Sequence, residues 1–218
     1  MLNTYYTVKQ QGMDEITIQK SRFIGHVKRV ETEEDAQKFI QEIKKKHYNA
    51  THNCSAYMIG ENDHIQKAND DGEPSGTAGV PILEVLKKKG LKDTAVVVTR
   101  YFGGIKLGAG GLIRAYGSTT SQAIKTTGIV KRQLMQGISV KVEYTLLGKL
   151  ENELRQSTEF KLADIHYLEN VEFIVYVKEE QESQFLTWIT DLTNDQATVK
   201  LQGTKYMEID VDDTPSPS

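Results

Sequence analysis

The chain has no long apolar run, no second cysteine and few prolines. Its 218 residues include one cysteine and four prolines. No run of about 18 or more apolar residues occurs, so we expect no membrane-spanning helix. The first residues lack the basic and apolar blocks of a signal peptide. A single cysteine forms no internal disulfide, which is typical of the reducing cytoplasm. We therefore expect a cytoplasmic globular protein with no membrane partner.

The lone cysteine also limits metal and thiol chemistry. Cys54 follows His52 and Asn53, but a zinc site needs about four ligands at suitable spacing, and the chain has no second cysteine. The interpretation that we favour is a cysteine buried on a strand. His52 lies two positions before Cys54 and would share its face of the strand, so a reactive pair is the alternative.

Charge is modest overall but unevenly distributed. The net charge is −3. Residues 1–130 contain 18 lysines and arginines against 14 acidic residues, whereas residues 131–218 contain 9 against 16. The first part could meet an anionic partner, and the acidic second part argues against an electrostatic grip on nucleic acid by the whole surface. The length allows one large domain or two of about 100 residues each.

Glycine is concentrated after one apolar stretch. The β-branched residues 95–99 predict a buried strand, and five of the nine residues from Gly103 to Gly111 are glycine. Apolar residues at helical spacing follow. A junction of strand, basic glycine loop and helix directs backbone N–H groups and a helix dipole toward one spot, which suits a phosphate. The spacing fits neither a Walker motif nor a dinucleotide fingerprint. A tight turn with close helix–strand packing is the alternative.

A second dense loop, residues 69–79, carries three carboxylates. Asp70, Asp71 and Glu73 precede a proline and a glycine. Oxygen ligands of this kind could hold Mg²⁺, and the Thr77 side of the loop could approach a phosphate before the next helix. The spacing of a calcium-binding loop is absent. A solvated acidic turn that caps a helix is the other interpretation.

The part before residue 130 alternates strand and helix signals. Strands are predicted at 7–9, 15–20, 23–27, 55–59, 65–68 and 95–99, and helices at 32–46, 81–89 and 109–128. The first helix opens with acidic residues and ends in lysines, as its dipole favours. Turns are predicted at Gln11-Gly12 and near Ser21-Arg22. A turn arginine is a candidate for an anion site.

The pattern changes after Gly128. Strands and helices follow in the order βαββαβ over about 75 residues, which is the split βαβ arrangement. Such a module is self-sufficient, so we place a domain boundary near residues 130–136. The last residues, 209–218, are acidic and contain proline, which predicts a disordered tail.

Two motifs carry a resemblance to a known family. Asp71-Gly72-Glu73-Pro74 is followed at a fixed interval by Arg100-Tyr101-Phe102-Gly103-Gly104-Ile105-Lys106-Leu107-Gly108. With both, nearly the whole chain resembles the IMPACT/YigZ family in its bacterial two-domain type. The resemblance implies an α+β fold. Its N-terminal domain, residues 1–132, has the left-handed βαβ arrangement of ribosomal-protein, elongation-factor and GHMP-kinase domains. The resemblance further implies that residues 136–208 form a ferredoxin-like domain similar to the last domain of elongation factor G.

The resemblance also implies a role in translation. Eukaryotic members modulate translation by competing for a ribosome-associated activator of a stress-responsive initiation-factor kinase. We expect a non-catalytic regulator that binds RNA or the ribosome, with no DNA specificity and no cofactor. A protein of the translation machinery is a further candidate partner. The alternative is a metal-assisted enzyme, or a binder of a small phosphorylated ligand, that uses Asp70, Asp71 and Glu73 as metal ligands.

These expectations assign two groups of residues to one cleft. The first group would bind nucleic acid or another anion: Arg22, Arg100, Tyr101, Phe102, Gly103, Gly104, Lys106, Gly108 and Arg114. The second group comes from the acidic loop and its neighbourhood: His52, Asp70, Asp71, Gly72, Glu73, Ser75 and Thr77. One of the two adjacent aromatic side chains is expected to be buried at the strand end. Stacking of a base on the other would contribute about 1–3 kcal/mol.

Overall fold

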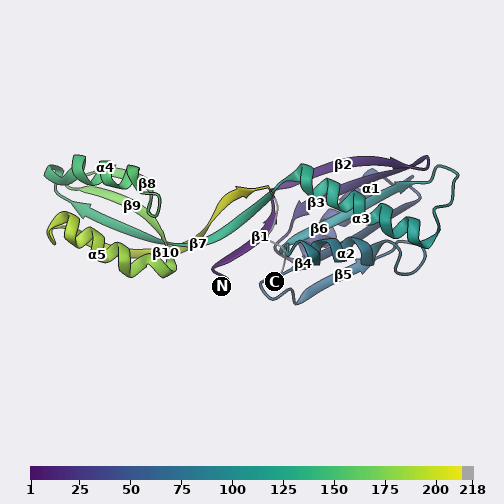
Figure 1. The fold of residues 1–218 in the computed structure, drawn as a ribbon, viewed down its shortest axis with the longest axis horizontal. Helices are drawn as coiled ribbons and strands as arrows, with labels where there is room; N and C mark the ends of the chain where they lie inside the picture. Colours follow the sequence, from purple (N-terminus) through teal and green to yellow (C-terminus); the bar gives the residue numbers. More distant parts are fainter. Residues whose placement is uncertain (213–218) are drawn as a thin grey trace. The chain divides into compact units, whose positions relative to one another are not determined.

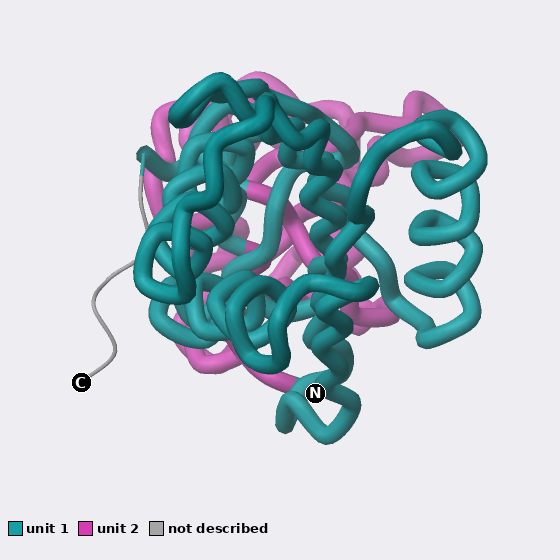
Figure 2. Tube along the Cα trace, turned by 90° about the vertical axis from the view of Figure 1, so that its right-hand side faces the viewer, with its two compact units in different colours: residues 1, 5–131, 209–218 teal, residues 2–4, 132–208 magenta. Residues whose placement is uncertain are grey.

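A computed structural model describes residues 1–212 of the chain (Figure 1). The chain forms two compact units (Figure 2). The first contains residues 1, 5–131 and the segment from 209 onward, and the second contains residues 2–4 and 132–208. Strands β7 (Ile129–Val142) and β10 (Thr198–Val211) contribute residues to both units. No helix among the described residues is long and apolar enough to cross a membrane.

The first unit is built on a five-stranded antiparallel sheet with three helices. In spatial order its strands are β2 (Gln11–Ile18), β3 (Ser21–Arg29), β6 (Thr94–Tyr101), β4 (His52–Ile59) and β5 (Ile65–Asn69). The helices are α1 (Glu33–Lys46), α2 (Gly79–Lys88) and α3 (Gly108–Thr127). Strand β1 (Thr4–Val8) pairs instead with β7.

Strand β6 lies at the centre of this sheet because both of its faces are apolar. Val96 and Val98 pack in the core beneath α2 and α3, whereas Ala95 and Val97 pack in the core beneath α1. All four side chains are fully buried. The continuous β-branched run is thus the signature of a strand covered on both sides. It places α1 on one face of the sheet and α2 with α3 on the other.

The first helix is confirmed by its end residues. The side chain of Thr32 accepts a hydrogen bond from the backbone of Asp35, which satisfies one of the donors left open at a helix N-terminus. Acidic residues occupy the first turn and lysines the last. Charges in this arrangement interact favourably with the helix dipole at both ends of the helix.

Of the two turns predicted in the first strands, the one at Gln11-Gly12 is wrong, and the one near Ser21-Arg22 lies two residues earlier than predicted. Gln11 and Gly12 lie within β2, and Ser21 and Arg22 begin β3. The hairpin turn instead falls on residues 19–20, both with positive φ, at 45° and 64°. Two-residue hairpins need this conformation, usually supplied by Asn-Gly. The sequence Gln-Lys gives no such signal, which is why the pattern alone predicts the turn two residues too late.

The second unit has the ferredoxin-like order of elements. After β7 come α4 (Leu147–Gln156), β8 (Lys161–Tyr167), β9 (Val171–Lys178), α5 (Glu182–Thr193) and β10. Short 3₁₀ turns at Tyr144–Leu146 and Glu179–Gln181 lead into the two helices. These strands belong to a five-stranded sheet in which β1, β7, β9 and β8 follow in this order and β10 also pairs with β7. On β9, alternate residues from Val171 to Val177 are fully buried, as a sheet covered on one face requires.

The predicted disordered tail is wrong for its first residues. Residues 209–211 are the end of strand β10. Val211 packs against the core of the first unit, and Asp210 accepts a hydrogen bond from Lys9 at 2.8 Å. Backbone pairing and one apolar contact therefore order a segment whose composition suggests disorder. Residues 213–218 lie outside the described residues.

Candidate functional site

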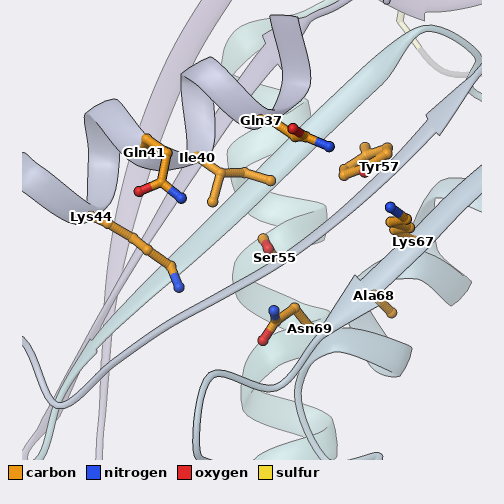
Figure 3. A pocket seen from close by; sticks show the side chains of 9 residues that line it. All are labelled: Gln37, Ile40, Gln41, Lys44, Ser55, Tyr57, Lys67, Ala68 and Asn69. Atoms are coloured by element: carbon orange, nitrogen blue, oxygen red, sulfur yellow. The ribbon is translucent and has the colours of Figure 1, made fainter. Parts of the chain in front are cut away.

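A polar cavity lies between α1 and strands β4 and β5 (Figure 3). Its volume is about 300 Å³, and its lining includes Lys44 and Lys67. Lys44 pairs with Asp71 at 2.6 Å and Lys67 with Glu33 at 2.8 Å. None of the side chains predicted from the two motifs lines this cavity, and its two lysines are balanced by carboxylates.

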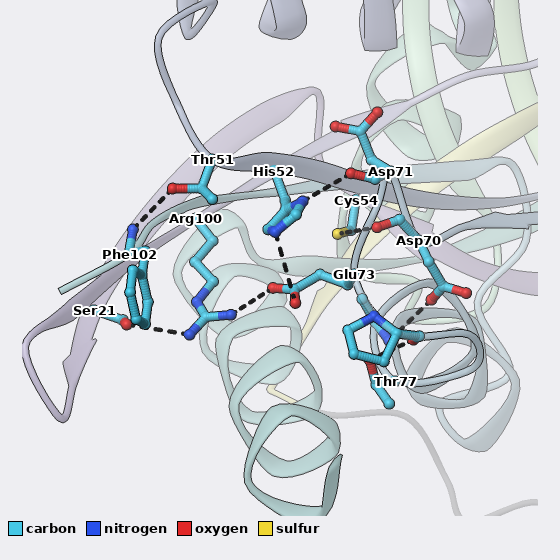
Figure 4. Close-up of polar contacts among 12 residues, drawn as sticks. Ser21, Thr51, His52, Cys54, Asp70, Asp71, Glu73, Thr77, Arg100 and Phe102 are labelled. Carbon is cyan, nitrogen blue, oxygen red and sulfur yellow. Dashed lines mark hydrogen bonds and ion pairs between the residues drawn. The ribbon is translucent and has the colours of Figure 1, made fainter. Parts of the chain in front are cut away.

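The two sequence motifs meet instead at a buried ion pair (Figure 4). The Nη1 atom of Arg100 donates to Oε1 of Glu73 at 2.7 Å, and only 5% of the arginine and 8% of the glutamate are exposed. The hydroxyl of Tyr116 on α3 donates to the same oxygen at 2.8 Å. The Nε2 atom of His52 lies 3.8 Å from the other carboxylate oxygen. Glu73 therefore joins the acidic loop, to which it belongs, to β6 and α3, and it lies close to His52 of β4.

Arg100 is held by two aromatic rings and by hydrogen bonds from its two terminal nitrogens, whereas its buried Nε has no hydrogen-bond partner among the described residues. Its guanidinium lies 5.4 Å from the ring centroid of Phe23 and 5.4 Å from that of Phe102. Its Nη2 atom donates to the hydroxyl of Ser21 at 3.3 Å, and the same hydroxyl accepts from the backbone of Gly103 at 3.2 Å. The predicted role of Arg100 as a surface phosphate ligand needs correction, because its charge is buried and already paired. From the interior, Arg100 contacts Phe102 of the glycine loop and Glu73 of the acidic loop.

Asp70 caps helix α2. One oxygen accepts from the backbone N–H groups of Ala78 and Gly79 at 3.0 and 2.8 Å, and the other accepts from Gly76 at 2.8 Å. Burial acts to raise the pKa of Asp70, but these three donors hold it below its ordinary value. The carboxylate thus satisfies donors that the start of a helix leaves open.

The neighbouring Asp71 joins the same loop to α1 and β4. It pairs with Lys44 and accepts from the backbone of Asn53 at 2.7 Å. Asp71 and Gly72 both have positive φ, at 45° and 88°, so the chain reverses sharply here. All three carboxylates proposed as metal ligands therefore accept bonds from this chain. Among residues 1–212 no group of three or more His, Cys, Asp or Glu is placed to hold a metal ion.

The other residues of the acidic loop have local roles. His52 donates through Nδ1 to the carbonyl of Asp71 at 2.8 Å, since a carbonyl can only accept. Thr77 is buried and donates to the carbonyl of Pro74 at 2.6 Å. Ser75 is exposed. The loop is thus built by its own polar contacts.

The buried strand cysteine is confirmed. Cys54 is fully buried on β4 and its sulfur donates to the carbonyl of Asp70 at 3.0 Å. The sulfur also contacts the hydroxyl of Tyr116 at 3.3 Å. Burial raises the pKa of Cys54 to about 12, so the thiol stays protonated at neutral pH. Its polar contacts are with these two groups and not with His52.

Close packing explains one glycine of the basic loop. A Cβ atom on Gly103 would lie 2.0 Å from the carbonyl oxygen of Lys20 in the β2–β3 turn, so only glycine fits. Gly104 and Gly108 have φ of 87° and 68°, a region that side chains disfavour. The alternative interpretation of the glycine cluster, a tight turn with close packing, thus describes these three positions.

The outer side of the loop is exposed. We use the name loop surface for the exposed loop residues Phe102, Ile105 and Lys106 together with Ile113 and Arg114, which are exposed on the following helix α3. The three apolar side chains are 46%, 40% and 45% exposed in that order. Neither adjacent aromatic residue is fully buried, because Tyr101 is also partly exposed.

Tyr101 and Arg22 lie on the opposite face of the sheet from Arg100. The Tyr101 hydroxyl bonds to Nδ1 of His47 at 2.9 Å, and the Arg22 guanidinium lies 5.5 Å from the ring centroid. Arg22 also donates twice to Glu15, at 2.5 and 2.8 Å, which holds the pKa of Glu15 below its ordinary value. Arg22 is thus a strand residue with a paired charge, rather than the turn residue predicted.

Comparison with known proteins covers both units. Residues 19–124 match the Impact N-terminal domain, and residues 140–196 match a domain of unknown function, DUF1949. The first match includes the acidic loop, the glycine loop and the buried pair.

Individual relatives cover nearly the full length. The IMPACT family member YvyE of Bacillus subtilis is 63% identical over 208 residues, 95% of each chain. An IMPACT family member of Haemophilus influenzae is 34% identical over 207 residues, 90% of this chain and 96% of the relative. A crystal structure described as a hypothetical protein superimposes with a TM-score of 0.59 at 28% identity, covering 91% and 97% of the two chains. The chain belongs to the IMPACT family.

Proposed function

We propose that this protein is a non-catalytic regulator of translation that binds RNA or the ribosome through the loop surface. The observation that carries the proposal is the exposure of an aromatic ring, two isoleucines and two cations on one short segment. Several large apolar side chains exposed close together in the sequence make this segment a candidate binding site. Arg100 lies beneath them and holds the loop in place, as do Gly103 and the β2–β3 turn.

The chemistry of this surface fits RNA. Base stacking on Phe102 would contribute about 1–3 kcal/mol. Lys106 and Arg114 would contact phosphates and make binding salt-dependent. The carboxylates that an enzyme would use for a metal ion are engaged by this chain's own donors, so we favour a binding function over catalysis.

Family membership supports the link to translation. Resemblance to the IMPACT family implies modulation of translation, which its eukaryotic members carry out. A protein IMPACT homolog of Dictyostelium discoideum is 41% identical over 97 residues, which cover 43% of this chain and 28% of that protein. The likeness to eukaryotic relatives is thus partial, so the RNA or ribosome contact is our proposal for this chain.

Cosedimentation with ribosomes and separated subunits over a salt series tests this function. The informative variant is Phe102→Ala with Lys106→Ala. A matched control is Tyr48→Ala with Lys45→Ala, which removes another exposed aromatic and lysine at the end of α1. We expect saturable binding that the loop variant loses and the control keeps. Equal binding by wild type and both variants would contradict the assignment to the loop, and no binding at low salt would contradict the function.

A further inference from the structure

The cavity between α1 and strands β4 and β5, which we call the α1 cavity, contains a buried serine. Alternate residues of β4 face α1, and Tyr57 and Ile59 pack in the core beneath that helix. Ser55 lies on the same face, and only 4% of it is exposed. A small hydroxyl residue therefore occupies a position whose neighbours on this face are large, and the open volume beside it is about 300 Å³.

The hydroxyl of Ser55 has no hydrogen-bond partner within residues 1–212, although it lines the cavity. In Figure 3 it lies between the side chains of Lys44 and Lys67. Buried polar groups in folded proteins nearly always have a partner. One water occupies about 30 Å³ in the liquid, so the cavity has room for a larger ligand that would bond to this hydroxyl.

Polar side chains from two elements line the space around this serine. Gln41 and Lys44 are three residues apart and share one face of α1. Lys67 and Asn69 alternate along β5 on the same face as Ile65, which packs against the core beneath α1. The helix and the edge strand therefore direct amide and ammonium groups toward one cavity.

The amide groups of the cavity have free donors and acceptors. The Oδ1 atom of Asn69 accepts from the backbone of Asp71 at 2.7 Å, so its Nδ2 group is left to donate into the cavity. The amide of Gln41 has no partner in the described part of the chain and offers both a donor and an acceptor. With the Ser55 hydroxyl, these groups can bond to a ligand that carries both carbonyl oxygens and N–H groups.

The two lysines add donors without adding net charge. Lys44 pairs with Asp71 at 2.6 Å and Lys67 with Glu33 at 2.8 Å. The hydrogen bond from Lys67 is the main cause that holds the pKa of Glu33 below its ordinary value, so this pair is ionised at neutral pH. Each ammonium has three donors, which leaves further N–H groups for a ligand. Because each positive charge is already neutralised, the cavity favours uncharged acceptors over a free anion.

We propose that the α1 cavity binds a nucleobase that carries carbonyl oxygens, uracil or guanine. Lysine donates to such oxygens and Asn and Gln amides pair with base edges, whereas adenine presents an amino group in place of the carbonyl. Ile40 and Tyr57 also line the cavity and supply apolar contacts for the faces of the ring. The inference goes beyond the proposed function, because a free nucleotide would carry the same base as RNA.

Titration of the ¹⁵N-labelled protein with UMP, GMP and AMP, followed in two-dimensional NMR spectra, tests the cavity. The first variant is Ser55→Val, in which one methyl group replaces the hydroxyl and a second fills space. Valine favours strands, so this protein should fold, and its spectrum shows whether it does. The second variant is Gln41→Ala on the exposed rim. Gln10→Ala is the matched control, since Gln10 is exposed between β1 and β2 and does not line the cavity.

The expected result is binding of UMP or GMP at least about 5-fold tighter than binding of AMP. The side-chain amide signals of Gln41 and Asn69 should shift with the added nucleotide. Ser55→Val should abolish binding, and Gln41→Ala should weaken it about 2- to 12-fold through the loss of a hydrogen bond. The control should bind as wild type does.

Three results would overturn the inference. They are no binding of UMP or GMP at up to about 10 mM, equal binding by wild type and Ser55→Val, and AMP that binds as tightly as the other two. Ribosome cosedimentation that depends on Phe102 and Lys106 would persist in each case, and the proposed function would stand.

The same variants distinguish the two sources of the base. Oligo(U) that binds more tightly than UMP, and loses this advantage in Ser55→Val, would assign the base to RNA. UMP binding without any effect of Ser55→Val on oligo(U) would assign it to a free nucleotide. Either result supports the cavity, including the case in which ribosome association fails.

Discussion

Arg100→Ala is expected to destabilise the first unit rather than merely weaken a binding surface. The substitution leaves the Glu73 carboxylate buried, with 8% exposure, and without its cationic partner at 2.7 Å. Removing one member of a buried pair costs about 3–5 kcal/mol, because the remaining charge is uncompensated. The loss of a side chain packed between Phe23 and Phe102 adds to this cost.

Urea unfolding followed by circular dichroism measures the effect. Lys106→Ala is the control, since an exposed loop side chain should change the free energy of unfolding by no more than about 0.5 kcal/mol. The double variant Arg100→Met with Glu73→Gln removes both charges and keeps an acceptor for Tyr116. It should recover most of the lost stability, because replacing a whole buried pair is often neutral.

Two results would refute this reasoning. An Arg100→Ala protein with the wild-type unfolding midpoint would show that the pair is not structurally required. A double variant as unstable as the single one would show that packing, and not the unpaired charge, accounts for the loss. In either case the assignment of Arg100 to the interior would lose its energetic basis, and a direct role in ligand binding would have to be tested again.

Other substitutions and conditions test the same unit. Gly103→Ala should lower the free energy of unfolding by about 1–3 kcal/mol, because the new Cβ would clash with the backbone of Lys20. Gly110→Ala in α3 should raise it by up to about 1 kcal/mol, because alanine favours helix over glycine. Thermal unfolding of the two variants measures both effects. Cys54 should resist iodoacetamide at pH 7 until urea unfolds the chain, and rapid native labelling would contradict its pKa of about 12. Burial lowers the pKa of His26 from 6.5 to about 4 in the folded protein. As the pH falls, His26 is therefore protonated in the unfolded chain at a higher pH than in the folded protein. Stability should thus fall by about 3 kcal/mol from pH 7 to pH 4, and His26→Gln should lessen this loss in urea titrations.

Local patterns were sufficient to predict much of the fold. The β-branched run of β6 predicted a buried strand, and Thr32 with its acidic neighbours predicted the start of α1. The alternation of apolar residues gave the βαββαβ order of the second unit. These signals work because each depends on residues close together in the sequence. The turn at residues 19–20 is not predicted at its true position, because Gln19 and Lys20 adopt positive φ there and the sequence has no glycine to indicate it.

The candidate site could not be predicted in this way. The partner of Arg100 lies 27 residues earlier, and nothing in the sequence says which of three nearby carboxylates it meets. The direction of a side chain at a strand end depends on register and on the loop that follows. The sequence predicted that the two loops share one site, but it gave no sign that Arg100 and Glu73 pair with each other in the interior.

The contacts of Glu73 show that the two family motifs form one structural unit. The acidic loop supplies the carboxylate, the strand before the glycine loop supplies the guanidinium, and α3 supplies Tyr116 to the same oxygen. Their pairing therefore requires no common ligand, because each motif completes the interior of the other. We therefore expect binding at the motif residues whose side chains are exposed, Phe102 and Lys106. A ligand that contacted both loops at once would have to break the Arg100–Glu73 pair. Because breaking this pair costs stability, the exposed residues of the glycine loop are the better candidates for ligand binding.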